Sequence, residues 1–414
     1  MHNNFTRVAL ITVCFFNLNL AVPSGSLDTT FNSAGTPPGT VQYSGAIGIG
    51  MTLQTDGKVV LAGYSGSNGA LVRYTSTGIL DSLFGTGGLV TTSTTDTLQF
   101  SAVTIQPDGN LVAAGVTLSG DLFVARYIAT NGALDSSFGS GGTVTTPIGS
   151  SLANFVDVTL QSDGKIVIAG TSDSPGKFTV VRYTAAGVLD TSFGTGGITK
   201  TAIGSNAIAN ALTIQTDGKI VVGGYASTSG NHFTVARYTA GGILDTTFGG
   251  TGIVTTIIGN NSYINGIALQ GSPAKIIAVG FSDLLGSTDF TIARYNPNGT
   301  VDTSFGTSGI TSTYIANSSQ AFGVAIQQDG KIVVSGRSSQ PPITFTLARY
   351  TINGTLDSAF GTGGIVLTPY GSSSSSFKVA IATDKKIVAS GFFGSAFGAA
   401  RYFSNPTIID VCTL

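Results

Sequence analysis

Short segments in which apolar and polar residues alternate recur along the whole chain, separated by Gly- and Asp-rich turns. In residues 209–256, for example, ANALTIQ and KIVVGGY flank a TDG turn, and HFTVARY follows after a polar stretch. Runs rich in β-branched residues favour strands, and Asp-Gly between two of them favours a hairpin turn whose two central residues have positive φ. A Gly-rich turn then leads to GIVTT, so we expect four short antiparallel strands in each such unit.

The unit recurs seven times, with three landmarks in a constant order. A phrase such as LDTSFGTGG carries an Asp in every copy, at intervals of 53 to 57 residues: Asp28, Asp81, Asp135, Asp190, Asp245, Asp302 and Asp357. An Arg-Tyr pair keeps the same spacing and begins at Arg73, Arg126, Arg182, Arg237, Arg294, Arg349 and Arg401. The third landmark, Gln-x-Asp-Gly, is altered in the fifth copy (QGSPAK) and the seventh (ATDKK). Four-stranded units of this length without a helical period are typical of propeller blades rather than of solenoid coils.

The two ends of the chain complement each other. The chain enters a unit at the start of its fourth strand, near Leu27, and leaves another at the end of its third strand, near Tyr402. Joining these fragments removes two sheet edges that an open array would have to protect. We therefore predict an all-β fold: a seven-bladed β-propeller over residues 26–402, with four antiparallel strands per blade and the N-terminal strand outermost in the last blade.

Each unit places its Arg eight or nine residues before its Asp in a chain of which only 9% is charged. We expect seven structural ion pairs: Arg73–Asp81, Arg126–Asp135, Arg182–Asp190, Arg237–Asp245, Arg294–Asp302, Arg349–Asp357 and, across the chain ends, Arg401–Asp28. An Asp that caps its own turn is the other structural interpretation, and a ring of anion or metal sites is the functional one. A group required in every blade serves the scaffold, so a ligand site is expected where the copies differ.

The copies differ between the second and third strands and between the fourth strand and the next blade. In an up-and-down sheet these loops emerge on one face, whereas the Asp-Gly hairpins and the LDTSFG connections occupy the other. The diversified loops are rich in Ser, Thr, Asn and Gly, which suits protein or carbohydrate surfaces and equally suits solvent-exposed loops. The candidate binding residues on this face are Lys177, His232, Tyr263, Asp289, Tyr314, Arg337 and Tyr370.

Composition limits the possible chemistry. The net charge is -1, so no basic surface indicates a nucleic acid partner. Beyond residue 25 the only histidine is His232, and we expect its side chain to be exposed. A single histidine argues against a multi-His metal site and against a catalytic triad that needs a second histidine. Glycosidases need two carboxylates, and no spacing singles out a pair among the non-repeating candidates Asp157, Asp173, Asp283 and Asp289. We expect no cofactor and no metal, with calcium at clustered Asp residues left open.

An apolar run follows Arg7 and is too short to span a bilayer but suits a secretory signal, so residues 1–25 are interpreted as a signal peptide. Cys14 follows Val13 rather than a small residue, which argues against a lipoprotein. Only Cys412 then remains, in a tail of residues 403–414, and one thiol excludes a disulfide framework. No other segment is long and apolar enough to span a membrane. We expect an exported monomer in the periplasm, at the cell surface or outside the cell.

The phrases LDTSFGTGG, IQTDGKIVVGG and FTVARYTAGGILD resemble the delta-60 repeat of bacterial exported and surface proteins, over about residues 27–402. The resemblance implies tandem β-repeats with a propeller-like fold, and it carries no activity, substrate or catalytic residue. The leading hypothesis is a non-enzymatic binding or adhesion scaffold that presents its diversified face to a protein or glycan. A polysaccharide-active hydrolase or lyase using Asp and Tyr residues, and a purely structural envelope protein, are the alternatives.

Overall fold

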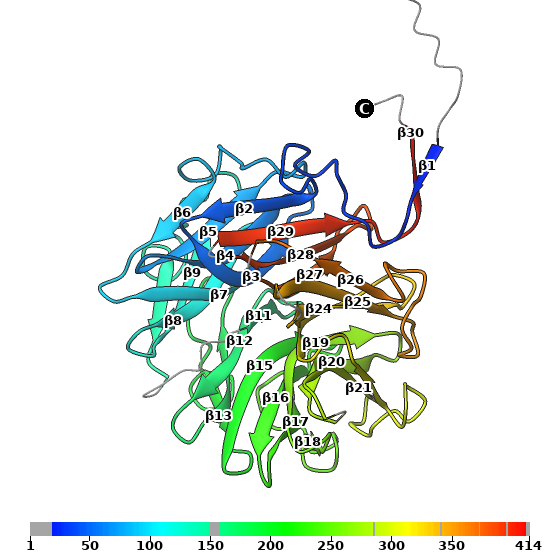
Figure 1. Ribbon diagram of the computed structural model, residues 1–414. Coiled ribbons are helices and arrows are strands. Elements are labelled where there is room, and N and C mark those ends of the chain that lie inside the picture. Colours follow the sequence, from blue (N-terminus) through cyan, green and yellow to red (C-terminus); the bar gives the residue numbers. More distant parts are fainter. Residues whose placement is uncertain are drawn as a thin grey trace, which may run out of the picture.

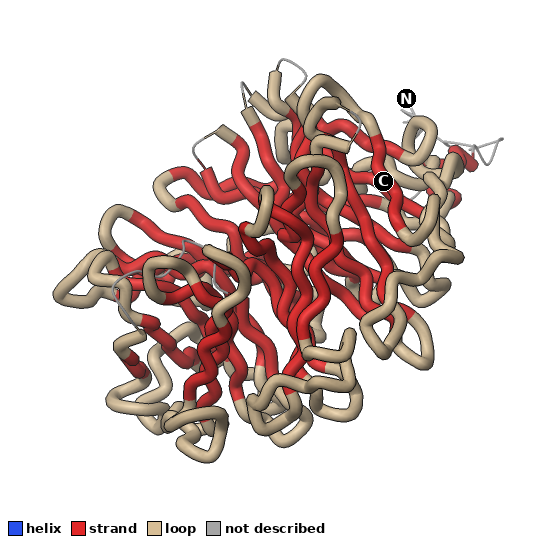
Figure 2. The backbone as a smooth tube through the Cα atoms, turned by 90° about the horizontal axis from the view of Figure 1, so that it is seen from below, coloured by secondary structure: helices blue, strands red, loops and turns tan. Residues whose placement is uncertain are grey.

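Strands arranged as blades around a common axis make up the protein (Figure 1). The computed structural model describes residues 19–148, 157–284, 286–339, 342–371, 373–394 and 396–410, and these residues contain strands and no helix (Figure 2). They form seven four-stranded antiparallel sheets. The predicted all-β, seven-bladed propeller is therefore confirmed.

The blades are numbered along the chain, and their strands run from the axis outward. Blade 1 comprises β3 (Ile47–Leu53), β4 (Val59–Ser65), β5 (Asn68–Tyr74) and β6 (Leu89–Thr92), and blade 2 comprises β7 (Leu98–Ile105), β8 (Leu111–Thr117), β9 (Leu122–Tyr127) and β10 (Thr143–Thr146). Blade 3 comprises β11 (Asp157–Leu160), β12 (Ile166–Ser172), β13 (Lys177–Tyr183) and β14 (Ile198–Thr201), and blade 4 comprises β15 (Asn206–Ile214), β16 (Ile220–Ser227), β17 (Asn231–Tyr238) and β18 (Ile253–Thr256).

The second half of the ring continues in the same order. Blade 5 comprises β19 (Ser262–Gln270), β20 (Lys275–Ser282), β21 (Asp289–Tyr295) and β22 (Ile310–Thr313), and blade 6 comprises β23 (Ser319–Ile326), β24 (Ile332–Ser338), β25 (Thr344–Tyr350) and β26 (Ile365–Thr368). Blade 7 comprises β27 (Ser374–Ile381), β28 (Ile387–Phe393), β29 (Ala396–Tyr402) and β2 (Thr40–Ser44). A separate two-stranded ribbon pairs β1 (Asn19–Val22) with β30 (Thr407–Asp410).

Both chain ends contribute to blade 7, as predicted. Strand β2 pairs with β29, from Thr40 opposite Ala400 to Ser44 opposite Ala396, and is the outermost strand. The β1–β30 ribbon projects from the ring beside this blade (Figure 1). Residues 1–18, which form most of the predicted signal peptide, and Cys412 lie outside the described residues. None of the described residues forms a helix long and apolar enough to cross a membrane.

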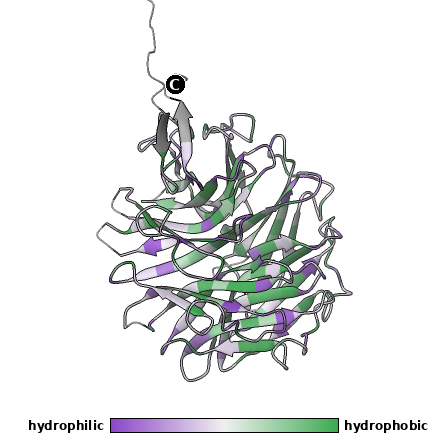
Figure 3. Ribbon diagram, turned by 90° about the vertical axis from the view of Figure 1, so that its right-hand side faces the viewer, coloured by the Kyte–Doolittle hydropathy of each residue, from purple (hydrophilic) through white to green (hydrophobic). Residues whose placement is uncertain are grey.

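The apolar core is divided among the seven interfaces between neighbouring blades. Between blades 1 and 2, for example, Val60 and Leu71 pack with Phe100 and Phe123. An equivalent cluster fills each of the other six interfaces. Green, hydrophobic stretches accordingly run along many of the strands (Figure 3). Burial of these faces drives blade-to-blade stacking, because a single four-stranded sheet exposes both of its surfaces.

The Asp-Gly hairpins form, but with a different turn from the predicted one. In the first hairpin only Gly57 has a positive φ, of 83°. The Gln54 N–H donates to the Lys58 carbonyl, and the Gly57 N–H donates to the Gln54 carbonyl. This pattern is a type I turn followed by a glycine bulge. In the altered seventh copy Lys385 takes the glycine position, with a φ of 67°, and the hairpin is retained.

The ring has two different faces, as the parity of the strands predicts. We call the face with the hairpins and the LDTSFG connections the motif face, and the opposite one the variable face. On the variable face the two kinds of diversified loop lie side by side: Thr288 bridges Ser318, and Ile343 bridges Ser373.

Candidate functional site

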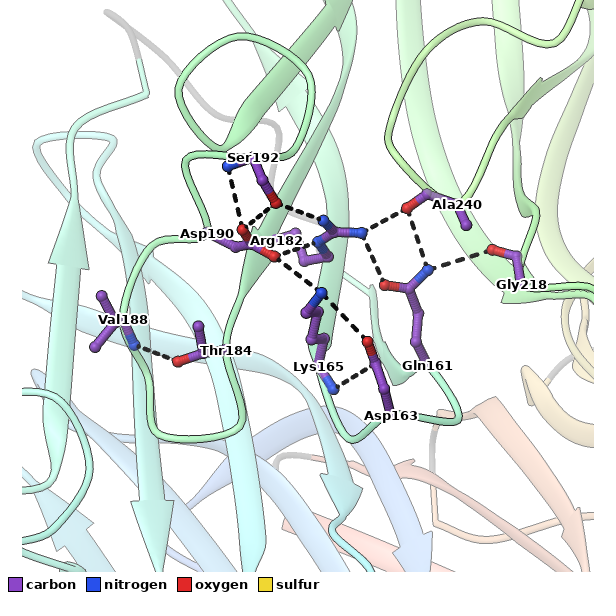
Figure 4. Close-up of polar contacts among 10 residues, drawn as sticks. All are labelled: Gln161, Asp163, Lys165, Arg182, Thr184, Val188, Asp190, Ser192, Gly218 and Ala240. Atoms are coloured by element: carbon purple, nitrogen blue, oxygen red, sulfur yellow. Dashed lines mark hydrogen bonds and ion pairs between the residues drawn. The ribbon is translucent and has the colours of Figure 1, made fainter.

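On the motif face, each repeated Arg and Asp belong to one assembly, shown for blade 3 in Figure 4. The Arg182 Nε donates to Asp190 Oδ2 at 2.9 Å. The other carboxylate oxygen, Asp190 Oδ1, accepts from the Ser192 hydroxyl at 2.6 Å and from its backbone N–H at 3.2 Å. One carboxylate therefore makes the ion pair and also caps its own turn.

The same arginine reaches into the next blade. Arg182 Nη1 donates to the Ala240 carbonyl of blade 4 and to Gln161 Oε1 (Figure 4). Its guanidinium carbon lies 4.6 Å from the ring centroid of Phe193, the phenylalanine of the repeated phrase. Beside it, the Gly194 N–H donates to the carbonyl of residue 241 at 2.9 Å. The motif therefore ties neighbouring blades together, and we call this assembly the latch.

The latch recurs at all seven interfaces. The Arg–Asp distances are 2.6 to 2.9 Å for Arg73–Asp81, Arg126–Asp135, Arg182–Asp190, Arg237–Asp245, Arg294–Asp302, Arg349–Asp357 and Arg401–Asp28. In the same order, the next-blade carbonyl acceptors belong to Ala129, Ala185, Ala240, Pro297, Ile352, Ser404 and Ser76. Because Arg401 bonds both Asp28 and Ser76, the last latch closes the ring.

At the interface of blades 6 and 7 the two carbonyl acceptors come from opposite chain ends. Arg349 donates to the Ser404 carbonyl, whereas the Gly361 N–H donates to the Ser24 carbonyl at 2.9 Å. Ser24 Oγ also donates to the Ser404 carbonyl at 2.7 Å, and the Gly25 N–H donates to the Phe403 carbonyl at 2.8 Å. Residues 24 and 25, which fall in the predicted signal segment, thus complete a latch.

A lysine missed by the sequence analysis joins six of the latches. The residue after each Asp-Gly turn places its Nζ 2.6 to 3.7 Å from the latch carboxylate, as in Lys165–Asp190 and Lys386–Asp28. Blade 2 carries Asn110 instead, and there Arg126 pairs through Nη2 while its buried Nε has no partner. The recurrence of Lys or Asn directly after the turn is the signal that could have revealed this third member.

The partners of two latch carboxylates, Asp190 and Asp28, stabilise their charged form. Hydrogen bonds from the Ser192 hydroxyl and N–H, together with the charges of Arg182 and Lys165, lower the pKa of Asp190 to about 2. At Asp28, burial opposes ionisation, but hydrogen bonds from Lys386 and Thr30 and the charge of Arg401 still lower its pKa. Seven Arg–Asp ion pairs in corresponding positions of the repeat indicate a structural role for this face.

Three hollows on the ring also follow the repeat. One of about 550 Å³ lies beside the Arg182 latch and is lined by its residues. Two others, of about 790 and 480 Å³, occupy equivalent outer positions between blades 3 and 4 and between blades 1 and 2. Within the described residues, no three His, Cys or Asp side chains are grouped so that they could hold a metal ion. None of these hollows distinguishes one blade from another.

Blade-specific side chains gather instead where the second strands approach the variable face. In each second strand one residue follows an invariant Gly, and we call these residues the variable set: Tyr64, Val116, Thr171, Tyr225, Phe281, Arg337 and Phe392. Six of the innermost strands carry a bulge nearby, centred on Ile49, Ser101, Asn210, Asn265, Phe322 and Phe377. Of these residues only Arg337 was among the predicted binding residues, although the contrast between a fixed Gly and its changing neighbour is visible in the sequence.

Members of the variable set form two clusters with residues of the innermost strands. On blades 4 and 5, the ring of Tyr263 lies 4.8 Å from that of Tyr225 and is stacked 4.7 Å from that of Phe281, and Asn231 Nδ2 donates to the Tyr263 hydroxyl. All three rings are half-buried.

The second cluster lies on blades 6 and 7. Gln320 Oε1 accepts from Arg337 there, and the guanidinium carbon lies 5.8 Å from the ring centroid of Phe322. Phe322 contacts Phe377, which in turn contacts Phe392.

The other predicted binding residues have mixed environments. Tyr314 is 57% exposed, and its hydroxyl lies 3.1 Å from Asn317 Oδ1. Lys177 pairs with Asp173 at 3.1 Å, and Tyr370 is half-buried against Phe393.

Two of the predicted surface residues are buried, and the prediction was wrong for them. His232 is 3% exposed and Asp289 is fully buried, because each already lies within the start of a third strand, between neighbouring blades. Asp289 accepts hydrogen bonds from the Ser287 hydroxyl, but burial still raises its pKa. Neither side chain is available to a surface ligand.

The four non-repeating carboxylates each have separate partners. Asp173 pairs with Lys177 and Lys200, and Asp283 accepts the backbone N–H groups of residues 260 and 261. Asp157 pairs with Lys378 at 3.1 Å. With Asp289 buried and the other three held by different partners, no contact among the described residues favours the hydrolase alternative.

The Asp157–Lys378 pair joins blades 3 and 7, which are not neighbours. Both residues lie opposite the residue that precedes the invariant Gly of the second strand, the position at which other blades have Gly50, Ala102, Ala211, Gly266 and Gly323. Because innermost strands surround the axis, this ion pair crosses the centre of the ring.

The fold and the seven latches define the class: a β-propeller built from tandem repeats and closed by both chain ends. Six segments match the family model described as a domain of unknown function (DUF5122) with a β-propeller fold: residues 54–84, 106–138, 161–193, 215–248, 275–305 and 327–360. Five of these segments run from the Gln-x-Asp-Gly hairpin to the latch phenylalanine, and the one in the altered fifth copy begins at Lys275 of its hairpin. The match supports a β-propeller repeat family, and the delta-60 name stays a resemblance. No curated protein matches the sequence significantly.

A solved structure of low sequence identity shares the fold. Raptor from Chaetomium thermophilum is 8% identical, with a TM-score of 0.57 over 93% of this chain. This chain corresponds to only 30% of that Raptor chain. Sqt1 from the same organism is 12% identical, with a TM-score of 0.49 over 91% of this chain and 100% of the Sqt1 chain. Such similarity concerns the fold alone.

Proposed function

We propose that this protein is an exported, non-enzymatic binding scaffold whose variable face engages a protein or glycan. The observation that carries the proposal is the contrast between the two faces. On the motif face the same Arg–Asp latch recurs in all seven blades. On the variable face the corresponding positions of the variable set differ from blade to blade and carry Tyr, Val, Thr, Phe and Arg. A rigid frame with differing loops and side chains on one face is the usual arrangement of a recognition scaffold.

The chemistry of the variable face suits binding. Half-buried aromatic rings such as Tyr263 offer flat apolar contact at small entropic cost, and neighbouring amides such as Asn231 offer hydrogen bonds. Both are held by contacts within the protein, so little ordering is needed on association.

Binding is tested with the exported chain on glycan arrays and on immobilised candidate proteins from the cell envelope. Tyr263→Ala and Tyr314→Ala should each weaken capture of the ligand, whereas Lys385→Asn on the motif face should leave it unchanged. The proposal is wrong if no ligand is captured, or if all three variants bind as well as the unaltered protein.

Export is a separate part of the proposal and rests on the apolar segment after Arg7. Because Ser24 and Gly25 complete a latch, we expect cleavage before Ser24 rather than after residue 25. This cleavage would remove β1 and leave β30 without its partner strand, while the seven blades and their latches would stay complete. N-terminal sequencing of protein recovered outside the cytoplasm tests this. Recovery of the uncleaved chain from the cytoplasm alone would contradict export.

A further inference from the structure

Arg337 differs from every other described arginine in having no carboxylate partner. The other seven each pair with the Asp of a latch. Arg337 is half-buried on the variable face, and this burial lowers its pKa. A partly desolvated cation without a counter-charge is costly unless another group neutralises it. Its charge is therefore available to an anion from outside the chain.

The hydrogen bonds of Arg337 leave one edge of the guanidinium open. Nε and Nη2 both donate to Gln320 Oε1, at 3.1 and 2.7 Å. These two bonds fix the plane of the group and use the edge that faces Gln320. Nη1 has no acceptor among the described residues, so the edge formed by Nη1 and Nη2 can still donate two parallel hydrogen bonds. That geometry matches a carboxylate.

The surroundings favour a sugar acid over a bare ion. Phe322, Phe377 and Phe392 form a half-buried aromatic row beside the guanidinium. On the adjoining loop the exposed Tyr314 and Asn317 carry hydrogen-bonding groups, and the Ser339 N–H donates to the Ser318 carbonyl, which ties this loop to the end of β24. Aromatic rings accept the C–H face of a pyranose, and hydroxyl and amide groups suit its ring hydroxyls.

We propose that Arg337, fixed by Gln320, binds the carboxylate of a uronic-acid-containing oligosaccharide whose sugar ring packs against the Phe322–Phe377–Phe392 row. This proposal rests on the proposed binding function and names the ligand class for one part of the variable face. An acidic peptide offers the same charge without the polyhydroxylated ring, and it is the competing occupant.

The test compares acidic sugars with their uncharged methyl esters and with an acidic peptide. Isothermal titration calorimetry of the full chain uses trimers of galacturonic, glucuronic and mannuronic acid, the methyl ester of each trimer, and a Glu-rich peptide. At least one free acid should bind, and its ester should bind about tenfold to a hundredfold more weakly, because a charge-assisted bidentate contact is lost. Equal binding of acid and ester, no binding of any acid, or Arg337-dependent binding of the peptide alone would overturn the assignment.

Variants place the site on the ring. Arg337→Gln should abolish the preference for acid over ester, and Arg337→Lys should retain a reduced preference because it keeps the charge but loses the planar fork. Lys385→Asn removes one positive charge from the motif face at a position with a φ of 67°, which Asn tolerates, and it should change nothing. Thermal unfolding confirms that each variant is folded. If Arg337→Gln keeps the full preference for acid over ester, this site is refuted. If Tyr263→Ala instead loses binding to a different ligand found on the glycan array, the broader binding proposal still stands.

Discussion

A single glycine in each second strand shows how the repeat constrains one residue. The bulge in the innermost strand brings a backbone carbonyl oxygen against this position, so a Cβ built on Gly224 would overlap the carbonyl oxygen of Ile208. The same overlap occurs at Gly63, Gly115, Gly280, Gly336 and Gly391. Because the obstacle is backbone, no rotamer change relieves it, and only glycine fits.

We predict that Gly224→Ala lowers the free energy of unfolding by about 1–3 kcal/mol or more, the usual cost of overpacking. Gly241→Ala is the matched control, since its φ is not positive and its added methyl meets no atom closer than 3.8 Å. The control should be neutral or stabilise by about 0.4–1 kcal/mol through the unfolded chain. Urea unfolding of both variants checks this, and equal losses would contradict the steric explanation.

At the scale of the element, the latch explains why the LDTSFG phrase is repeated. Its Asp fixes the Arg, its Phe lies under the guanidinium, and its Gly N–H donates to the next blade. In the first copy Asn32 replaces this Gly, adopts a φ of 48° and donates to the Thr77 carbonyl. Asn is the side chain that tolerates this conformation best, so the contact survives the substitution.

The latch predicts acid sensitivity. A carboxylate whose pKa is lower in the folded than in the unfolded state stabilises the fold above the unfolded value of about 3.9, and this contribution is lost as the pH falls towards the folded value. For Asp190 the folded pKa is about 2, so its contribution is lost between about pH 4 and pH 2. The pKa values of Asp28, Asp245 and Asp357 are lowered as well. We expect constant stability from about pH 7 to pH 5 and a progressive loss below about pH 4.

Urea unfolding between pH 7 and pH 2.5 measures this loss, and Asp190→Asn provides the comparison. The variant should be less stable at pH 7, and its stability should depend less on pH below about pH 4 because one titrating group is gone. Parallel curves for the variant and the unaltered protein would show that Asp190 makes no such contribution.

At the scale of the whole molecule, the chain ends act as one blade-to-blade connection. Ser24 accepts from Gly361 and donates to Ser404, and Gly25 donates to Phe403. A chain that begins at Ser26 loses these three contacts, whereas one that begins at Ser24 keeps them.

We expect the Ser26 variant to be less stable than the Ser24 variant by about 1.5–4.5 kcal/mol, at about 0.5–1.5 kcal/mol for each of the three hydrogen bonds. Both carry a serine amine at the new terminus, so the comparison isolates residues 24 and 25. Equal denaturation midpoints in guanidinium chloride would mean that these contacts do not stabilise the ring.

The sequence was sufficient to predict the architecture, because the spacing of the repeated landmarks and the complementary chain ends can be seen in residue type and order alone. It could not show that Arg182 reaches the Ala240 carbonyl, since a backbone acceptor has no signature in residue type. The sequence did not reveal that His232 is buried, because it does not fix the first residue of a strand. A difference of one position there decides whether a side chain lies in a loop or between two blades. The contrast between an invariant Gly and its changing neighbour is visible in the sequence, but the reason for it, the bulge in the adjacent strand, has no signature in residue type.

The Asp157–Lys378 ion pair also connects two blades that are not neighbours. It joins innermost strands across the axis, whereas every latch joins adjacent blades. Any widening of the ring would separate these two charges, so the pair would oppose expansion at a point that no contact between adjacent blades reaches.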